Sequence, residues 1–406
     1  MRRSLIACGL ALVASACGGG GGGGGGGFGP SNPWYVAGAA IDGQAISVDE
    51  FWVTYVDGDG RPDLLIAGPP RDSGLGVAPL GLQAAFGRAD GGFDFGYPNV
   101  GGTDRDVNAP AAVLGRFDLD PFPDVAYFRE LGGQSGVVLC HGRGDGTYAV
   151  GAGSPVPLGT HATMLAVAEM NGDAFDDLVF GDHGVGIGVL LSNGAGGFGP
   201  PIVVLLPNAG ELRSVAPGDV DWDGDLDVVV LQQHGRLTIA HNDGAGNLTL
   251  ATNFVTESLV EALIVDDASG PQFVAVFGRA PVPHVTIYPR DANGSFELST
   301  SHRIDLADGF DVCVAMRPVR PALDGGLSHV AVIARNGTTS ELALFLVRPE
   351  TTSQLAERLQ VRRGQPLRLA VGDLNFDDAQ DLVLETGWSD ADGSGFHLET
   401  LLSRGR

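Results

Sequence analysis

The chain has 406 residues and a formal net charge of −25 at pH 7, although only 18% of its residues are charged. Such an acidic balance disfavours nucleic acid and anionic membrane surfaces as partners. Of the four cysteines, Cys140 and Cys313 fall in different repeats of the sequence, so we expect them to be buried apolar residues rather than a disulfide pair.

Residues 1–17 are typical of an export signal. The basic start Met1-Arg-Arg precedes an apolar stretch, Leu5–Val13, that is too short to span a bilayer. The small residues before Cys17 resemble the signal of a bacterial lipoprotein, in which the cysteine is lipidated. We expect an extracytoplasmic protein anchored by lipid at Cys17 to the outer membrane or in the periplasm, with cleavage and secretion as the alternative.

Residues 18–33 predict a tether between this signal and a folded head. Gly18–Gly27 is an uninterrupted glycine tract, and as a flexible chain its ends would lie on the order of 15–20 Å apart. Such a segment suits a globular head held away from a membrane. Replication slippage in a GC-rich gene also explains a run of this kind.

The most informative pattern is a nine-residue acidic loop. Asp219–Asp227 reads Asp-Val-Asp-Trp-Asp-Gly-Asp-Leu-Asp, with carboxylates at positions 1, 3, 5 and 9, and residues 169–177 and 373–381 repeat the pattern. Converging oxygen atoms of this kind suit Ca²⁺. Position 6 needs a residue that tolerates the left-handed region. Gly224 adopts this conformation without strain, whereas Ala174 and Asp378 would each destabilise the fold by about 1–2 kcal/mol.

Two further loops are less complete. Residues 55–63 begin with Tyr55, and residues 116–124 begin with Arg116, where a first carboxylate is expected. We interpret Arg116 as an internal cation whose guanidinium pairs with the acids of its own loop in place of a metal. An Asp at position 9 of all five loops, at a strand start where Asp is disfavoured, favours a ligand role over simple turn formation.

The loops recur about every fifty residues between short apolar runs. Leu165–Val167 before one loop and Leu178–Phe180 after it predict a hairpin, and Gly-rich turns such as Asn193–Phe198 predict a second one. Eroded copies that begin at Ala262 and Val312 bring the repeats to seven. The predicted fold is all-β: a seven-bladed β-propeller of four-stranded antiparallel blades with calcium-binding hairpin loops.

Residues 34–406 are expected to form this propeller. The last repeat stops one strand short at Leu401–Arg406, whereas Trp34–Ala40 resembles an outer strand. We expect the N-terminal strand to complete the seventh blade, because a closed ring removes exposed strand edges.

These loops resemble the FG-GAP/VCBS repeats, best known from the seven-bladed propeller heads of integrin α chains. In that family the loop joins the two innermost strands of a blade and binds calcium. The resemblance implies about three calcium sites, with position 7 contributing its carbonyl, formed by Glu169, Asn171, Asp173, Phe175 and Asp177; by Asp219, Asp221, Asp223, Asp225 and Asp227; and by Asp373, Asn375, Asp377, Ala379 and Asp381. Two less complete sets raise the possible total to five: Asp57, Asp59, Arg61 and Asp63; and Asp118, Asp120, Phe122 and Asp124.

Catalytic patterns are not evident in the sequence. The nine histidines show no metal-binding spacing, and there is no Gly-x-Ser-x-Gly elbow or phosphate loop. We interpret the chain as a monomeric, non-enzymatic binding or adhesion platform for a protein or glycan ligand on the bacterial cell envelope. The alternatives are a carbohydrate-binding or hydrolytic propeller, with its site on the face opposite the calcium loops, and a structural component of an envelope complex.

Overall fold

The computed structural model describes most of the chain from residue 35 onward. The described residues are 35–43, 50–68, 79–89, 92–96, 99–104, 112–182, 184–207, 210–255, 259–265, 273–278, 282–289, 301–306, 310, 312–319, 329–336, 342–347, 354–359, 365–390 and 393–403. The expected signal, the lipidation site Cys17 and the tether lie outside these ranges, so they remain predictions.

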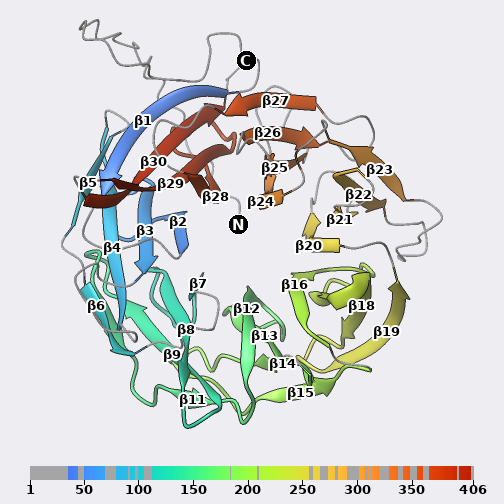
Figure 1. Cartoon of the computed structure of the whole chain (residues 1–406). Coiled ribbons are helices and arrows are strands. Elements are labelled where there is room, and N and C mark those ends of the chain that lie inside the picture. The colour runs from blue at the N-terminus through green and yellow to red at the C-terminus, as the bar shows by residue number, and fades with distance from the viewer. Residues whose placement is uncertain are drawn as a thin grey trace, which may run out of the picture.

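Seven antiparallel sheets surround a central axis like the blades of a propeller (Figure 1). Blades one and two consist of β2 (Glu50–Thr54), β3 (Asp63–Gly68), β4 (Pro79–Gly87), β5 (Phe93–Phe95) and β6 (Asn99–Asp104), and of β7 (Ala112–Gly115), β8 (Asp124–Glu130), β9 (Ser135–Gly142), β10 (Tyr148–Val150) and β11 (Val156–Pro157). Their outer edge is split into two short strands, both of which pair with the third strand.

The next four blades have four strands each. Blades three and four consist of β12 (Ala162–Ala168), β13 (Asp177–Asp182), β14 (Gly186–Leu190) and β15 (Ile202–Leu205), and of β16 (Leu212–Gly218), β17 (Asp227–Gln232), β18 (Arg236–Asn242) and β19 (Leu248–Val255), with the short 3₁₀ helix η1 (Gln233–Gly235) before β18. Blades five and six consist of β20 (Leu259–Val265), β21 (Phe273–Gly278), β22 (His284–Pro289) and β23 (His302–Asp305), and of β24 (Val312–Val319), β25 (His329–Arg335), β26 (Leu342–Val347) and β27 (Gln354–Leu359). The two eroded repeats are therefore blades, as the sequence predicts.

The ring closes through the N-terminal strand. Blade seven consists of β28 (Gln365–Gly372), β29 (Asp381–Asp390), β30 (Gly393–Ser403) and β1 (Tyr35–Gly43). Strand β1 pairs antiparallel with β30, from Tyr35 opposite Ser403 to Gly43 opposite Phe396. This pairing confirms the expected closure, which protects an edge of β30 that would otherwise be open.

The apolar core lies between the blades. The second strands β3, β13 and β17 are buried along their whole length, because both faces of a blade are covered by its neighbours. Seven apolar clusters each join residues of two adjacent blades; for example, Leu65 of blade one packs with Val138 of blade two. Cys140 is buried in that cluster, whereas Cys313 packs against the cluster of blades five and six.

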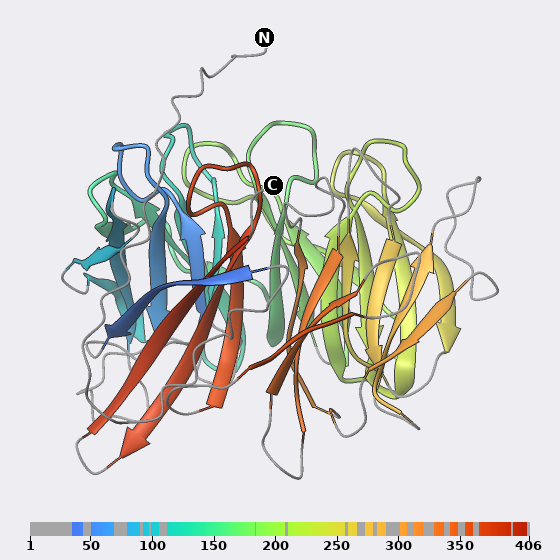
Figure 2. The same cartoon turned by 90° about the horizontal axis from the view of Figure 1, so that it is seen from above.

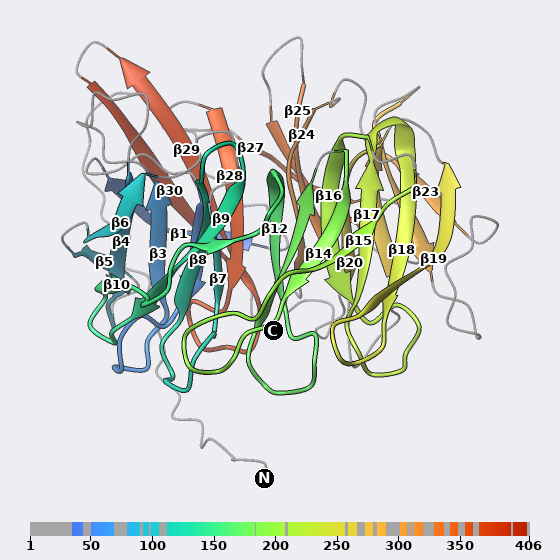
Figure 3. The ribbon, with the colours of Figure 1, turned by 90° about the horizontal axis from the view of Figure 1, so that it is seen from below.

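All five acidic loops emerge on one face of the ring, at the top in Figure 2 and at the bottom in Figure 3. Each joins the first, innermost strand of its blade to the second strand, as β12 and β13 illustrate. The hairpins between the third and fourth strands of blades two, three and four open on this same face. Within the described ranges, no helix is long and apolar enough to cross a lipid bilayer.

Candidate metal-binding face

Each acidic loop is built from two successive Asx turns. The side-chain oxygen at position 3 accepts the backbone N–H of position 5, and the oxygen at position 5 accepts the N–H of position 7. In blade four, for example, Asp223 Oδ1 lies 3.0 Å from the amide nitrogen of Asp225. Asp and Asn are favoured here because their short side chains reach the backbone two residues ahead. In each Asp, one oxygen shapes the loop and the second faces other groups.

The three complete loops share a backbone that the other two lack. Positions 4 and 6 are both left-handed in blades three, four and seven: Gly172 (φ 76°) and Ala174 (φ 72°), Trp222 (φ 68°) and Gly224 (φ 100°), and Phe376 (φ 62°) and Asp378 (φ 63°). In blade one only Gly60 is left-handed, and in blade two neither position is. The expected conformation of Ala174 and Asp378 is confirmed. A bulky aromatic residue at a left-handed position was not anticipated and costs about 1–2 kcal/mol.

The Asp at position 9 is a buried clamp in all five loops. Its Oδ2 accepts the N–H of position 2 at 2.8–3.1 Å, and its Oδ1 accepts an N–H at the end of the third strand at 2.6–3.0 Å. The five clamps are Asp63, Asp124, Asp177, Asp227 and Asp381, all fully buried. This bonding gives Asp at position 9 a structural reason that the sequence argument for a ligand did not include.

Burial raises the pKa of several clamp carboxylates. Desolvation raises the pKa of Asp177 to about 6 and that of Asp381 to about 7, against the lowering effect of their backbone N–H donors. Neighbouring loop carboxylates raise both values further. Desolvation also raises the pKa of Asp63 and Asp227. A cation in the loop would oppose this effect by favouring the ionised forms.

The donor set of blade four fits a hard divalent cation. Carboxylate oxygens of Asp219, Asp221 and Asp223 lie within 4.8 Å of one another. In blades three and seven, the acid at position 1 closes the loop instead: Glu169 accepts three backbone N–H groups, and Asp373 accepts three as well. Carboxylate and amide oxygens are the ligands that calcium prefers.

At position 7 the side chain covers a glycine of the outer turn in the same blade. Phe122, Phe175 and Asp225 lie over Gly144, Gly194 and Gly244, respectively, where an added Cβ would approach within 2.2–2.4 Å. These glycines are left-handed as well. The close approach explains glycine in the outer turns, whereas Arg61 and buried Ala379 complete position 7 in the other loops.

The first loop carries its own positive charge. The guanidinium of Arg61 lies 2.9 Å from Asp59 Oδ2, and the pair is well exposed. Asp59 also accepts the backbone N–H of Arg61. The second oxygen of Asp59, which would face a metal, is thus taken by a cation of the chain.

The expected role of Arg116 in the second loop is wrong. Its guanidinium donates to the carbonyl of Ala174 in blade three, not to the acids of its own loop. Its backbone N–H donates to Asp176, and its carbonyl accepts the N–H of Asp176. The sequence could not show this contact, because it depends on how neighbouring blades are placed. Arg116 links two blades.

Two histidines that the sequence analysis did not assign reach the acidic loops. His141 Nδ1 lies 3.0 Å from Asp118 Oδ2 and 3.5 Å from Asp124 Oδ1. His241 Nδ1 lies 3.1 Å from Asp221 Oδ2 and 3.3 Å from Asp227 Oδ2. Each histidine is at the end of the third strand, beside the residue whose N–H binds the clamp, so each acidic cluster gains an imidazole.

Large apolar side chains project from the same face. Four of the seven large apolar residues found exposed among the described residues are on the acidic loops: Tyr55 (48%), Leu119 (84%), Trp222 (63%) and Phe376 (58%). Three of these occupy position 4, the loop tip. Single exposed apolar residues are ordinary, but their concentration beside carboxylates on one face is typical of a contact surface.

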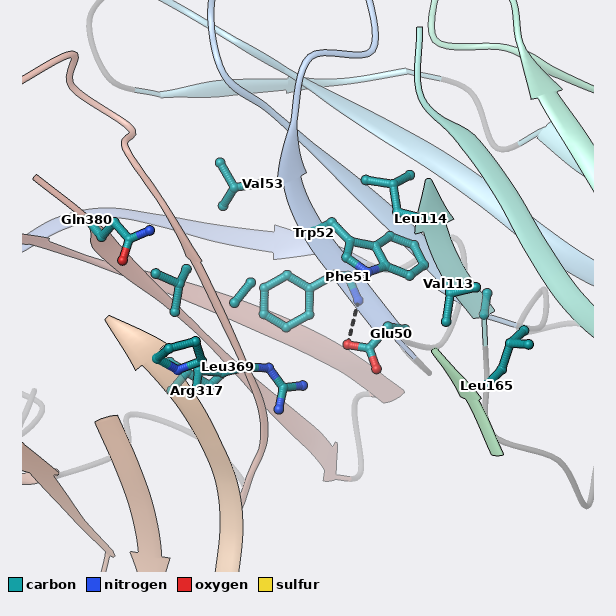
Figure 4. A pocket seen from close by; sticks show the side chains of 14 residues that line it. Glu50, Phe51, Trp52, Val53, Val113, Leu114, Leu165, Arg317, Leu369 and Gln380 are labelled. Carbon is teal, nitrogen blue, oxygen red and sulfur yellow. Dashed lines mark hydrogen bonds between the residues drawn. The ribbon is translucent and has the colours of Figure 1, made fainter. Parts of the chain in front are cut away.

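A cavity of about 570 Å³ lies along the axis of the ring. It is lined by the innermost strands β2, β7, β12, β24 and β28, and Trp52, Glu50 and Arg317 are among its side chains (Figure 4). Of the described residues that line it, only Glu50 and Arg317 are ionisable. It extends from Glu50, at the start of β2, to Gln380 in the acidic loop of blade seven.

Comparison with known proteins agrees with this architecture. Residues 169–230 match the model of a family described as FG-GAP-like repeat, and they cover the acidic loops of blades three and four. No curated protein sequence matches the chain. A solved structure of BBS1N in complex with ARL6DN is 16% identical, with a TM-score of 0.56 over 91% of this chain and 97% of that one.

Two further solved structures are more distant. The exotype rhamnogalacturonan lyase YesX is 13% identical, with a TM-score of 0.48 over 86% of this chain and 60% of that chain. A protein of unknown function from Dyadobacter fermentans is 12% identical, with a TM-score of 0.48 over 92% of this chain and all of the other.

Proposed function

We propose that this chain, a seven-bladed propeller in which residues 169–230 match the FG-GAP-like repeat, is a calcium-stabilised, non-enzymatic platform that binds a protein partner through its acidic-loop face. Calcium would be held by the loops of blades three, four and seven. The expected export signal and lipid anchor would place the platform on the bacterial cell envelope.

The observation that carries this proposal is the set of exposed apolar loop tips. Trp222 and Phe376 are held outward in a left-handed backbone, which a bulky residue adopts only at a cost. The same loops carry the oxygens that suit calcium, so ion binding would fix the positions of these tips. Aromatic anchors on a rigid, polar-rimmed surface are typical of protein-binding sites. The BBS1N propeller was solved in complex with ARL6DN, which is consistent with a role of this kind.

A paired-variant capture experiment tests the loop face. Protein with Trp222→Ser and Phe376→Ser is compared with protein carrying Val203→Ser and Leu205→Ser, which removes two exposed apolar residues from β15 at the outer edge of blade three. Envelope extract is applied to each with calcium and with EGTA. We expect one set of partners to be retained by the edge variant in calcium and lost from the loop variant and in EGTA. Equal retention by both variants would contradict the proposal.

The axial cavity supports a second candidate, a carbohydrate-binding site. Trp52 offers an aromatic side chain, and Glu50 and Arg317 offer polar groups at a concave site of suitable volume. Unlike the site expected from the sequence, it runs along the axis instead of lying on the face opposite the loops. A glycan array probed with wild-type protein and with Trp52→Ala distinguishes the candidates: binding that Trp52→Ala abolishes and that the loop-tip substitutions leave intact would favour the cavity.

A further inference from the structure

We propose that Asp118, Asp124 and His141 of blade two form a site for a divalent first-row transition metal ion such as Zn²⁺. The proposal builds on the metal-binding role of the acidic loops and goes beyond it. The loop of blade two then has a different ion preference and is not a degenerate calcium loop. Arg116 stands where the first carboxylate is expected, and His141 provides a ligand in place of that carboxylate.

The position of His141 is filled by apolar residues in blades one and three. The equivalent residue is Phe86 in blade one and Leu191 in blade three, each just before the residue that donates to the clamp. Those side chains pack against a left-handed glycine in the outer turn of the next blade, Gly146 and Gly246 respectively. The fold therefore needs only an apolar side chain that fills this position. An imidazole turned to two carboxylates exceeds that requirement.

The ring is oriented with Nδ1 towards the loop. On its far edge, a hydrogen bond joins the ring to the backbone of Gly196 in blade three, and a Cβ on Gly196 would lie 2.7 Å from Nε2. Metal-binding histidines commonly use one ring nitrogen as a ligand and hold the ring in place by a hydrogen bond from the other. The Gly196 contact would perform this second role.

The two distances from His141 to the carboxylates match a shared ion. Ligand atoms at about 2.0–2.2 Å from one metal, at tetrahedral or octahedral angles, lie about 2.8–3.6 Å from each other. His141 Nδ1 lies 3.0 Å and 3.5 Å from the two carboxylate oxygens. Nδ1 is buried, and the carboxylates of Asp118 and Asp124 are the charged groups nearest to it. A buried ring nitrogen close to two carboxylates is the arrangement expected of three co-ligands of one ion.

The ligand chemistry separates this site from the calcium loops. Calcium takes oxygen ligands almost exclusively, whereas imidazole suits zinc and the other late transition metals. Blade four provides an internal comparison, because His241 is placed similarly but that loop also has a cluster made only of oxygen donors, from Asp219, Asp221 and Asp223. With calcium in excess, we expect blade four to hold calcium and blade two to remain available.

Metal titration of the full chain tests the site. Protein saturated with calcium is titrated with Zn²⁺ by calorimetry and with Co²⁺ by visible absorption, for wild type, His141→Leu and His241→Leu. Leucine is the residue of blade three at this position, so His141→Leu should fold, as a melting curve verifies. We expect one Zn²⁺ equivalent and ligand-field bands of Co²⁺ in wild type and His241→Leu, and at least ~100-fold weaker binding in His141→Leu.

Two results would overturn the inference: no Zn²⁺ or Co²⁺ binding in the presence of calcium, or binding that His141→Leu leaves unchanged. In either case His141 serves only to fill space and form hydrogen bonds in blade two. A separate calcium titration of the metal-free protein reports on blades three, four and seven, so a failure of the proposed calcium role is distinguishable from a failure of this site.

Discussion

The loops of blades four and two share the hydrogen bonds that shape them but differ in the residues that could bind an ion. Both contain two Asx turns and a buried clamp, Asp227 or Asp124, that binds two backbone N–H groups. Blade four adds a carboxylate at position 1 and two left-handed residues, whereas blade two has an arginine that binds the neighbouring blade. The comparison teaches that the residues that shape the loop are separable from those that complete an ion site. The predictions below test this separation, beginning with the largest effect.

Removal of calcium should destabilise the protein through the complete loops. With millimolar calcium and a dissociation constant of roughly 0.1 mM, each site would contribute about 1.4 kcal/mol, or about 4 kcal/mol for three. The melting temperature should fall in EGTA and recover with calcium but not with magnesium, as differential scanning calorimetry would measure. An unchanged melting curve would contradict calcium binding by all three loops.

Loss of a clamp should destabilise both blades alike. Asp227→Ala and Asp124→Ala each leave two buried N–H groups without an acceptor, and each should lower the free energy of unfolding by about 2–4 kcal/mol even in EGTA. Urea denaturation of the two variants measures the effect. A loss only in blade four, and only with calcium present, would show that position 9 serves chiefly as a ligand.

Substitution at position 5 should instead distinguish the two loops. Asp223→Ala removes a central oxygen of the blade-four cluster and should abolish one calcium equivalent, about 1.4 kcal/mol at millimolar calcium. Asp120→Ala should leave the calcium count unchanged, because blade two lacks the first carboxylate. Isothermal titration with calcium decides the point. If Asp120→Ala loses a full equivalent, the distinction between the loops is wrong.

The metal-free protein should become more stable as the pH is lowered from about 8 towards 5.5. The folded-state pKa of Asp381 is raised from the usual 3.8 to about 7, so protonation favours the fold and this stabilisation is lost as the pH rises through that value. Asp177, at about 6, acts in the same direction. Melting temperatures in EGTA should show the trend, and Asp381→Asn should weaken it. A trend that is the same in that variant would assign the effect to other groups.

The sequence was sufficient for the architecture because local signals and the repeat agreed. Apolar runs such as Leu178–Phe180 beside acidic turns define hairpins, and the missing last strand predicts that an N-terminal strand such as β1 closes the ring. The complete loops were also recognisable, since the Asx turns and the left-handed position 6 depend on residues close in sequence.

What the sequence could not provide depends on contacts between strands and blades. His141 lies well beyond its loop and meets Asp118 only through the register of the third strand. The partner of Arg116 belongs to the next blade. Backbone propensity also disfavours an aromatic residue in a left-handed conformation, so the sequence did not predict that Trp222 has a φ of 68°. A glycine at the same position in blade three, Gly172, is the signal that could have indicated it.

Relief of strain at position 6 should give the smallest effect. Ala174 is left-handed in blade three, and Ala174→Gly should raise the free energy of unfolding by about 1 kcal/mol, because glycine adopts this conformation without a Cβ clash. Gly60→Ala in blade one is the matched reverse change: Gly60 has a φ of 77° and open space around its Cβ position, so only the backbone conformation should matter, with a loss of similar size. Urea denaturation in EGTA measures both. Opposite effects would show that the loop geometry is retained without an ion, whereas no effect in either variant would mean that these loops adopt the left-handed backbone only when an ion is bound.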